Sequence, residues 1–265
     1  MPANHWLSFH ERWARLRAPL RPNDEIVATF REALGGAAGR VLLLGVTPEL
    51  AGLGDELVAV DRSQPMIDHV WPGDTARRRA RRGDWLALDF AAGSFDAAVG
   101  DGTLNALPFP MGATRLFAQL ATILRPGGRF VCRVFAAPDA AEPLAALPEA
   151  AAHGEVGNFH ALKWRIAMAL VRQNGEPNLA VQAIRDAFIR WFPDRAALAR
   201  ATGWAREDID TIDVYDGSAE VYSFPTRGEL LALVPDGFAD ARFVEAGRYP
   251  LAERCPFLIV ETHGR

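Results

Sequence analysis

Residues 41–45 read Val-Leu-Leu-Leu-Gly, and residues 56–61 read Glu-Leu-Val-Ala-Val-Asp. Both are largely unbroken apolar runs, the first ended by a glycine and the second by a carboxylate. Such runs are typical of strands that are buried on both faces, as in a parallel sheet covered by helices. Residues 95–101 (FDAAVGD) and 127–135 (GGRFVCRVF) repeat the pattern. The sequence therefore predicts a parallel β-sheet.

Amphipathic helices are predicted between these strands. Residues 22–35 begin with Asn23 or Asp24 as the cap, repeat apolar residues at helical spacing and reach a glycine at the stop position. A second helix follows Ser63, and a third precedes the helix breaker at 125–128 (RPGG). Alternation of strands and helices with short connections predicts a doubly wound α/β sheet.

Residues 137–215 depart from this alternation, because their apolar periodicity is mostly helical. Four helices are predicted there, at 139–152, 158–172, 178–192 and 194–203. A capping box at Thr226–Glu229 then begins another helix, and two strand-like segments follow, at 241–250 and 255–262. We therefore predict one domain over residues 1–265, with an N-terminal helical cap at 1–36 and a helical lid inserted at 137–215.

The composition is that of an ordinary globular protein, with 49% hydrophobic and 23% charged residues. The formal net charge of −4 gives no general attraction to nucleic acid or to an anionic membrane. Cys132 and Cys255 lie outside any metal-binding pattern, so we expect reduced thiols and no metal site. No apolar run resembles a signal peptide or a membrane span, which predicts a cytoplasmic protein without a membrane partner.

A run of arginines occupies residues 77–82 (RRRARR), where the third strand is expected. In a doubly wound sheet this strand lies at an edge, and charges on an edge prevent pairing with other chains. The alternative interpretation is a track for RNA phosphates, but such a track needs a broad basic face. We favour the solvated edge.

The turn after the first strand is the first candidate ligand site, since ligands of such sheets bind beyond the carboxyl ends of the strands. Gly45 lets a ligand approach the backbone, and Val46 follows it. Thr47 is predicted to cap the next helix and Pro48 to occupy its first turn, so that the helix N-terminus faces a ligand carboxylate. The absence of G-x-G-x-x-G argues against a dinucleotide.

Carboxylates at later strand ends extend this site. Asp61 ends the second strand and is placed to accept hydrogen bonds from ribose hydroxyls, with Arg62 and Met66 beside it. Its alternative role is to cap the helix after Ser63. Asp84 and Trp85 together suit an adenine ring, as acceptor and cover, although a polar turn with a core tryptophan remains open.

A further candidate ligand-binding position lies at the end of the strand predicted at 95–101, where the chain reads Gly100-Asp101-Gly102. Asp101 is placed either to accept from an amino group of the ligand or to orient a substrate, and a turn aspartate is the alternative.

Taken together, VLLLGVTPEL, VAVDRSQPMI, RRGDWLAL, FDAAVGDGTLNALPF and LRPGGRFVCRVF resemble the ordered motifs of class I S-adenosylmethionine-dependent methyltransferases, over about residues 40–136. The resemblance implies a seven-stranded Rossmann-like sheet in the order 3-2-1-4-5-7-6, with the helical insertion after strand 5. It implies S-adenosylmethionine as the methyl donor and S-adenosylhomocysteine as the product. It also implies cofactor-binding roles for Gly45, Asp61, Asp84, Trp85 and Asp101.

Two motifs depart from the usual family pattern. The glycine-rich loop is reduced to Gly-Val-Thr-Pro-Glu-Leu at 45–50, and the turn at 100–102 is Gly-Asp-Gly instead of Asn/Asp-Pro-Pro-Tyr/Phe. The second departure argues against methylation of base amino groups.

The expected partner is a small-molecule acceptor. The alternatives are a methyltransferase for RNA or protein, a non-catalytic S-adenosylmethionine-binding protein and a nicotinamide-dependent dehydrogenase.

Candidate groups for catalysis are few. His160 shares one face of a predicted helix with Trp164 and is the tentative general base, although a lone histidine is more often structural. Trp6 and Trp13, a heptad apart, belong to a segment that either folds over the cofactor or simply packs against the domain.

Overall fold

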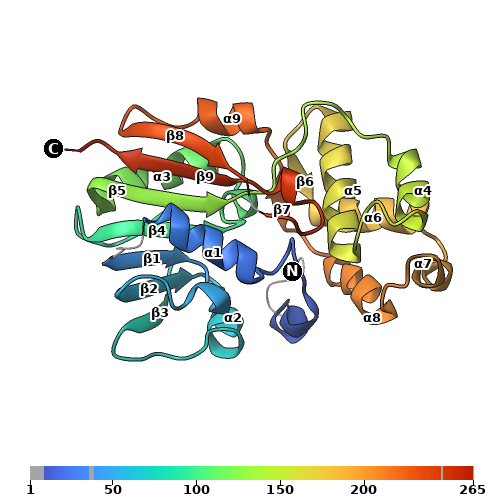
Figure 1. Ribbon diagram of the computed structural model, residues 1–265, viewed down its shortest axis with the longest axis horizontal. Helices are drawn as coiled ribbons and strands as arrows, with labels where there is room; N and C mark the ends of the chain where they lie inside the picture. The colour runs from blue at the N-terminus through green and yellow to red at the C-terminus, as the bar shows by residue number, and fades with distance from the viewer. Residues whose placement is uncertain (1–8, 36–38, 246, 265) are drawn as a thin grey trace.

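The computed structural model describes residues 9–35, 39–245 and 247–264, which contain a seven-stranded sheet with the order β3-β2-β1-β4-β5-β9-β8 (Figure 1). The first five strands are parallel: β1 (Arg40–Leu44), β2 (Glu56–Asp61), β3 (Arg78–Arg82), β4 (Phe95–Asp101) and β5 (Leu124–Arg133). β9 (Phe257–Thr262) runs antiparallel to both β5 and β8 (Phe238–Val244). This confirms the order predicted from the sequence.

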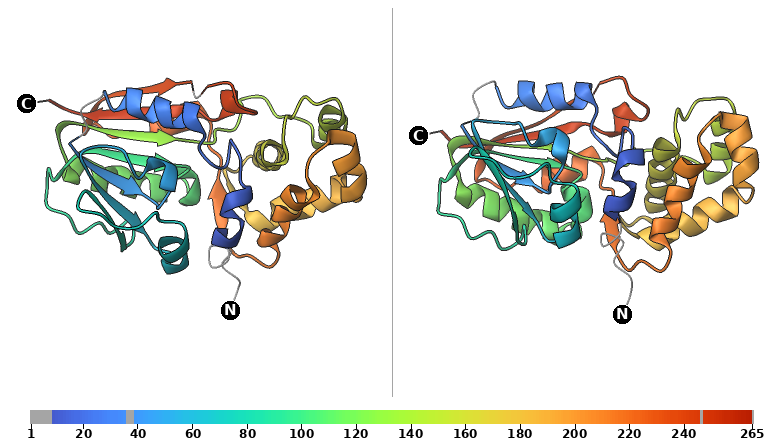
Figure 2. Two further views of the ribbon diagram at one scale, coloured as in Figure 1. Left: turned by 60° about the horizontal axis from the view of Figure 1, so that its bottom comes forward. Right: turned by 90° about the horizontal axis from the view of Figure 1, so that it is seen from below.

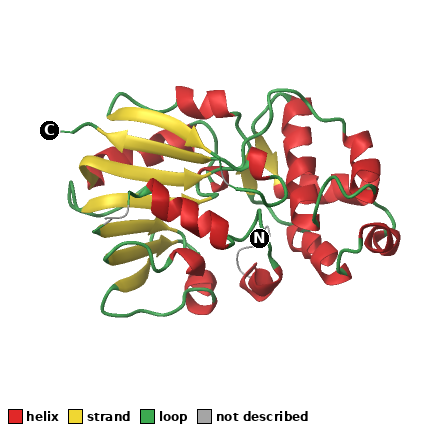
Figure 3. Ribbon diagram, in the orientation of Figure 1, coloured by secondary structure: helices red, strands yellow, loops and turns green. Residues whose placement is uncertain are grey.

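The helices around the sheet begin at the predicted caps (Figure 3). Asn23 accepts from the Ile26 amide at the start of α1 (Asp24–Ala33), and Ser63 accepts from the Met66 amide at the start of α2 (Gln64–His69). Thr226 and Glu229 form the predicted capping box of α9 (Arg227–Ala232). Between β4 and β5 lies α3 (Met111–Ile123). These local signals therefore determine where the helices begin.

Both faces of the central strands are buried, which explains their continuous apolar runs. Val41 and Leu43 of β1 belong to the core that includes α1, whereas Leu42 and Leu44 belong to the core that includes α3 and α9. Alternate residues of a strand point to opposite faces, so a strand between two helical layers needs apolar residues at every position.

Residues 125–128 follow the end of α3, as the predicted helix breaker requires. They already belong to β5, which begins at Leu124 and pairs with β4 through a register shift between Phe95 and Ala97. The amide of Gly127 donates to His263 O at 3.1 Å, and that of Gly128 donates to Thr262 Oγ1 at 2.9 Å. These bonds to the C-terminal segment hold the irregular start of β5, where Gly127 has a φ of +70°.

A helical unit lies beyond the carboxyl ends of the parallel strands (Figure 1, right). It contains short 3-10 turns at η5 (Leu144–Ala146) and η6 (Asp210–Tyr215). Its α-helices are α4 (Leu147–Ala152), α5 (Phe159–Asn174), α6 (Val181–Trp191), α7 (Arg195–Thr202) and α8 (Arg206–Ile209).

Two predictions for this region were wrong. The helix predicted over 139–152 is not helical over 139–143 and consists only of η5 and α4. Residues 178–180 form β6 (Asn178–Ala180) instead of the first turn of a helix, and they pair antiparallel with β7 (Val221–Ser223). The paired residues lie 41 to 45 positions apart along the chain, so helical periodicity could not reveal the pairing. The helical insertion was predicted to end at residue 215, but β7 at Val221–Ser223 still pairs with the helical unit.

Among the described residues, no helix combines the length and apolar character that a bilayer crossing requires.

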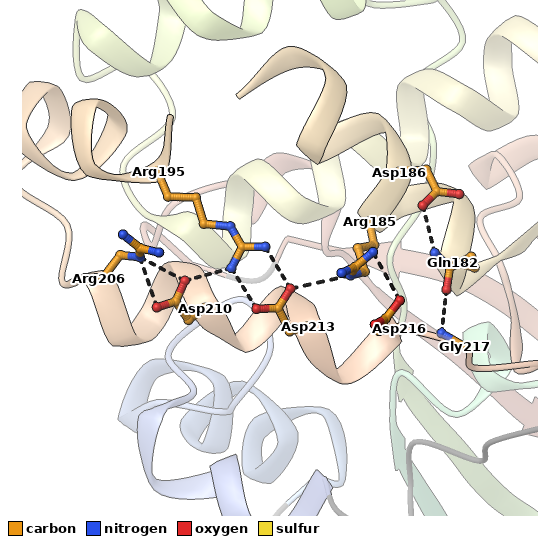
Figure 4. Close-up of polar contacts among 9 residues, drawn as sticks. All are labelled: Gln182, Arg185, Asp186, Arg195, Arg206, Asp210, Asp213, Asp216 and Gly217. Carbon is orange, nitrogen blue, oxygen red and sulfur yellow. Dashed lines mark hydrogen bonds and ion pairs between the residues drawn. The ribbon is translucent and has the colours of Figure 1, made fainter. Parts of the chain in front are cut away.

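Ion pairs hold η6 against α6 and α7 (Figure 4). Arg195 donates to Asp210 at 2.7 Å and to both oxygens of Asp213 at 2.7 Å, and its guanidinium is only 17% exposed. Arg185 on α6 contacts Asp213 at 3.4 Å and Asp216 at 3.1 Å. Three elements of the helical unit thus share one network of charges.

We expect Arg195→Met to lower the free energy of unfolding by about 1–2 kcal/mol, because Asp210 and Asp213 lose charged hydrogen bonds in a partly buried network. The control is Arg200→Gln on α7, whose nearest carboxylate is 4.0 Å away and whose side chain is 72% exposed; we expect a change below about 0.5 kcal/mol. Urea unfolding measures both. Equal losses in the two variants would contradict a structural role for the network.

α5 also buries a lysine, Lys163, with 1% of its surface exposed. Its ammonium lies 4.8 Å from the centre of the Tyr215 ring and 5.4 Å from that of Trp164, and it makes no ion pair with a carboxylate in the described ranges. Burial, with a smaller contribution from the Arg12 cation, lowers the pKa of Lys163 to about 7.

The buried cation should make stability depend on pH. An unfolded lysine has a pKa of about 10.4, so between pH 7 and 10 the unfolded chain binds more protons and the folded state gains stability as pH rises. We expect Lys163→Met to be more stable than the wild type by a few kcal/mol near pH 6.5, and this difference to shrink by pH 9.5. Thermal unfolding at both pH values measures it. A difference independent of pH would show that Lys163 is not a buried cation.

Candidate functional site

A cavity of about 380 Å³ opens at the carboxyl ends of β1, β2 and β4 and is also lined by Trp164, Tyr215 and Tyr222. Every residue predicted from the sequence to bind the cofactor lines it, except Pro48. The lining members are Gly45, Val46, Thr47, Asp61, Arg62, Met66, Asp84, Trp85, Asp101 and Gly102. The structure therefore brings together residues that the sequence places at the ends of separate strands.

The floor of the cavity is formed where Gly45 meets Trp85. The Gly45 amide donates to Val60 O at 2.8 Å, and the Trp85 indole donates to the same carbonyl at 2.6 Å. Gly45 has a φ of +115°, and a β-carbon there would contact the indole ring at 3.9 Å. A side chain at this position would be strained and would occupy space beside the ring.

The predicted helix after this turn is wrong. Pro48–Leu50 form only a three-residue 3-10 turn (η3), and the Thr47 side chain makes no capping hydrogen bond. So short a turn aligns too few peptide dipoles to give a helix N-terminal field. Glu49 accepts from Arg21 at 2.5 Å, which ties η3 to the N-terminal segment. The proposed carboxylate site at a helix end is therefore withdrawn.

Asp61 combines burial with a fixed orientation. Its Oδ1 accepts from the Ser63 amide at 2.8 Å, so the capping alternative and the ligand alternative are both compatible with its position. Burial raises the pKa of Asp61 to about 6, against the lowering effects of the Ser63 amide and the Arg62 cation. Arg62 itself pairs with Glu220 at 2.6 Å, which links β2 to the segment before β7.

Asp84 lines the cavity from the turn after β3. Its Oδ1 accepts from the Leu86 amide at 2.9 Å, and the residue is exposed. The hydrogen bond from Leu86 fits the alternative that Asp84 only stabilises a polar turn. Because Asp84 also lines the cavity, its role as an acceptor for adenine stays a prediction.

Asp101 has a partner that the sequence analysis missed. Arg133 is its cross-strand neighbour on β5, and the guanidinium donates to both carboxylate oxygens, at 2.5 and 2.9 Å. Arg133 is fully buried, and the negative charge of Asp101 raises its pKa. At this point the cavity is lined by an ion pair with no net charge. The predicted role of Asp101, to accept from an amino group of the ligand, stays a prediction, with Arg133 fixing the orientation of the carboxylate. The sheet register would have revealed the pair.

A second set of lining residues was not foreseen as a group. It brings aromatic rings from distant parts of the chain to one cavity: Trp13, Phe135, Trp164, Tyr215 and Tyr222. The remaining unforeseen lining residues are Leu20, Leu44, Ser63, Gly83, Leu86, Thr103, Asn105, Ala106, Leu107 and Pro108. Helical periodicity had indicated Trp164 as one face of α5, but only the tertiary structure joins it to the other rings.

The N-terminal segment covers this cavity, between the sheet and the helical unit (Figure 2). Trp13 from η2 (Phe9–Arg15) and Leu20 line it, which favours the covering alternative over simple packing. Asn158 at the start of α5 donates to Ala18 O at 2.7 Å and holds the segment in place. Trp6 lies outside the described residues.

His160 is not placed as a general base, and this prediction was wrong. It does not line the cavity, it is 1% exposed, and its Nε2 lies 3.2 Å from Arg15 O. Burial lowers the pKa of His160 to about 3, with Lys163 adding to the effect. The residue is a neutral packing group between α5 and the N-terminal segment.

Solved structures share this architecture at low sequence identity. A putative Zn-dependent alcohol dehydrogenase from Rhodobacter sphaeroides is 15% identical with a TM-score of 0.59, with both chains fully covered. The N-methyltransferase NodS from Bradyrhizobium japonicum WM9, in complex with S-adenosylhomocysteine, is 13% identical with a TM-score of 0.53, covering 98% of this chain and 99% of that one. A SAM-dependent methyltransferase from Methanosarcina mazei is 14% identical with a TM-score of 0.50, covering 93% and 100%. At these identities the likeness shows the fold.

A family model described as a methyltransferase domain matches residues 44–132, from the end of β1 into β5. The sequence matches no curated protein. The matched segment contains the turn at Gly45, the acid at Asp61 and the strand end at Asp101. With the family match, the sheet order and the ordered motifs in agreement, residues 44–132 form a methyltransferase domain on a Rossmann-like sheet.

Proposed function

We propose that the cavity holds S-adenosylmethionine beside Gly45, Asp61 and Trp85 and presents its methyl group to a small-molecule acceptor. The observation that carries this proposal is that the predicted cofactor residues and the aromatic residues of the helical unit line one cavity, covered by the N-terminal segment.

The residues present fit the donor. Gly45 leaves the ends of β1 and β2 open to a flat adenosine, and the Trp85 ring beside it provides an apolar surface for a base. Asp61 offers a carboxylate for ribose hydroxyls, and burial raises its pKa to about 6. Asp101, fixed by Arg133, supports the amino-acid end of the donor.

When bound, S-adenosylmethionine supplies an activated methyl group, so the chain has mainly to align the acceptor and exclude water. The N-terminal segment and the helical unit do this by closing over the cavity from two sides. Their positions are tied to the cofactor side through Arg21–Glu49 and Arg62–Glu220. The helical insertion thus acts as a lid in this proposal.

The enclosed cavity supports a small acceptor over RNA or protein. The arginine run forms the edge strand β3, which pairs on one side only with β2. Arg78 donates to the carbonyls of Gly73 and Pro72, and Arg81 pairs with Asp89. These local contacts fit a solvated edge.

We expect Asp61→Asn to weaken S-adenosylhomocysteine binding about 10- to 100-fold, because the ribose hydroxyls lose a charged acceptor. The thermal shift with saturating S-adenosylhomocysteine measures this, with Asp68→Asn on exposed α2 as control. In the wild type, affinity should fall as pH drops below about 6, because protonation removes the charge; Asp61→Asn should lose this pH dependence. Full binding by the variant would remove Asp61 from the site.

The acceptor class is tested by incubating the protein with S-adenosylmethionine and either a metabolite extract or RNA and protein fractions, and following S-adenosylhomocysteine by mass spectrometry. We expect turnover with small molecules alone. A variant in which Arg77, Arg79 and Arg81 are all changed to Gln should keep that turnover. Turnover with RNA or protein that this variant loses would establish the macromolecular alternative.

A further inference from the structure

Four aromatic rings form a continuous wall on the acceptor side of the cavity, here called the aromatic wall: Phe135, Trp164, Tyr215 and Tyr222. Trp164 lies at its centre, with its ring centre 5.3 Å from Phe135 and 5.8 Å from Tyr222. Tyr215 and Tyr222 meet edge to face at 6.2 Å. Such a surface favours a flat, apolar ring as the bound group.

The tyrosine hydroxyls and the Asn105 amide near the aromatic wall already have partners, whereas the buried Nε1 of Trp164 makes no hydrogen bond among the described residues. The hydroxyls of Tyr215 and Tyr222 are hydrogen-bonded to each other. The amide of Asn105 donates to the carbonyls of Phe135 and Ser223 at 2.8 and 2.7 Å and accepts from the Phe135 amide at 2.9 Å. Among the described lining residues, the carboxylates are Asp61, Asp84 and Asp101, all at strand ends on the donor side. The wall therefore provides no carboxylate or imidazole as a general base.

A positive charge lies against the aromatic wall outside the cavity lining. The Lys163 ammonium contacts the rings of Tyr215 and Trp164, at 4.8 and 5.4 Å from their centres. The charged group that acts on it from the N-terminal segment is Arg12, which is also positive, and His160 on its own helix is held neutral. This end of the cavity disfavours a cationic acceptor and stabilises an anion that forms against the wall.

We propose, on the basis of the proposed function, that the acceptor is a phenol-type molecule, a flat ring bearing an acidic hydroxyl, which packs on the aromatic wall and reacts as the anion stabilised by Lys163. Lys163 is a positioning charge in this proposal, since it does not touch the cavity. Its charge is present where Lys163 is protonated, below about pH 7, and there it lowers the pKa of the bound hydroxyl.

The reaction balances without a base from the protein. The hydroxyl proton of the acceptor leaves to solvent, and the resulting oxygen anion forms a bond to the methyl carbon. The bond between that carbon and sulfur breaks, and its electron pair stays on sulfur. The products are a methyl ether and S-adenosylhomocysteine, and no oxidant or reductant is required.

The test uses 4-nitrophenol as the probe, because its phenol and phenolate forms have different absorption spectra. It is titrated with pH while bound to the full-length protein saturated with S-adenosylhomocysteine, for the wild type and for Lys163→Met. We expect the bound phenol to have a lower pKa in the wild type than in the variant, by up to about one unit, because Lys163 is itself protonated only below about pH 7. Equal values, a lower value in Lys163→Met, or no saturable binding to the wild type would overturn the proposal.

Matched controls distinguish the contribution of the aromatic wall to binding from that of the Lys163 charge. 4-Nitroaniline has the same shape without an acidic hydroxyl, so its affinity should not change in Lys163→Met. Trp164→Leu should weaken both ligands at least tenfold, whereas Trp191→Leu, a tryptophan of α6 outside the cavity, should leave both unchanged. Equal binding by the two tryptophan variants would remove the aromatic wall as the binding surface. Failure of S-adenosylhomocysteine to stabilise the wild type would instead overturn the proposed function itself.

Discussion

The side chain of Asn105 holds the cavity together. It follows β4 and makes three hydrogen bonds, two to the backbone of Phe135 beyond β5 and one to Ser223 of β7. It is 4% exposed, so these bonds are protected from water, and losing them would leave buried backbone groups without partners. Through this residue the central strands and the small sheet of the helical unit keep one fixed separation, which is the width of the cavity.

A second pair of contacts repeats this connection. Asn178 of β6 both accepts from the Phe109 amide and donates to the Phe109 carbonyl, at 2.8 and 2.7 Å. Ser223 also donates to Leu104 O at 3.2 Å. The base of the helical unit is thus bonded to the loop after β4. The N-terminal segment, which carries Trp13 and Leu20, closes the cavity on another side.

Buried charge is arranged differently on the two sides of the cavity. On the donor side, the buried Arg133 is neutralised by Asp101. On the acceptor side, Lys163 has aromatic rings as neighbours and no carboxylate within the described part of the chain. A lysine buried in this way costs stability, which suggests that its charge is retained for binding or reaction.

The sequence determined the sheet and its ligand edge. Continuous apolar runs at 41–45 and 95–99 require two covered faces, and Asn23, Ser63 and Thr226 mark helix starts through hydrogen bonds made within three residues. These signals are local. Gly45, Asp61 and Trp85 could be assigned to one edge because parallel strands end on the same side of a sheet.

Only the tertiary structure decided the contacts between distant segments. The pairing of β6 with β7, the bond from Arg133 to Asp101 and the gathering of Trp13, Trp164 and Tyr222 all depend on register and on how the insertion packs. The same packing made His160 a buried neutral group and reduced the turn after Thr47 to η3. The physical reason is that apolar periodicity specifies which face of an element is buried, but not which other element buries it.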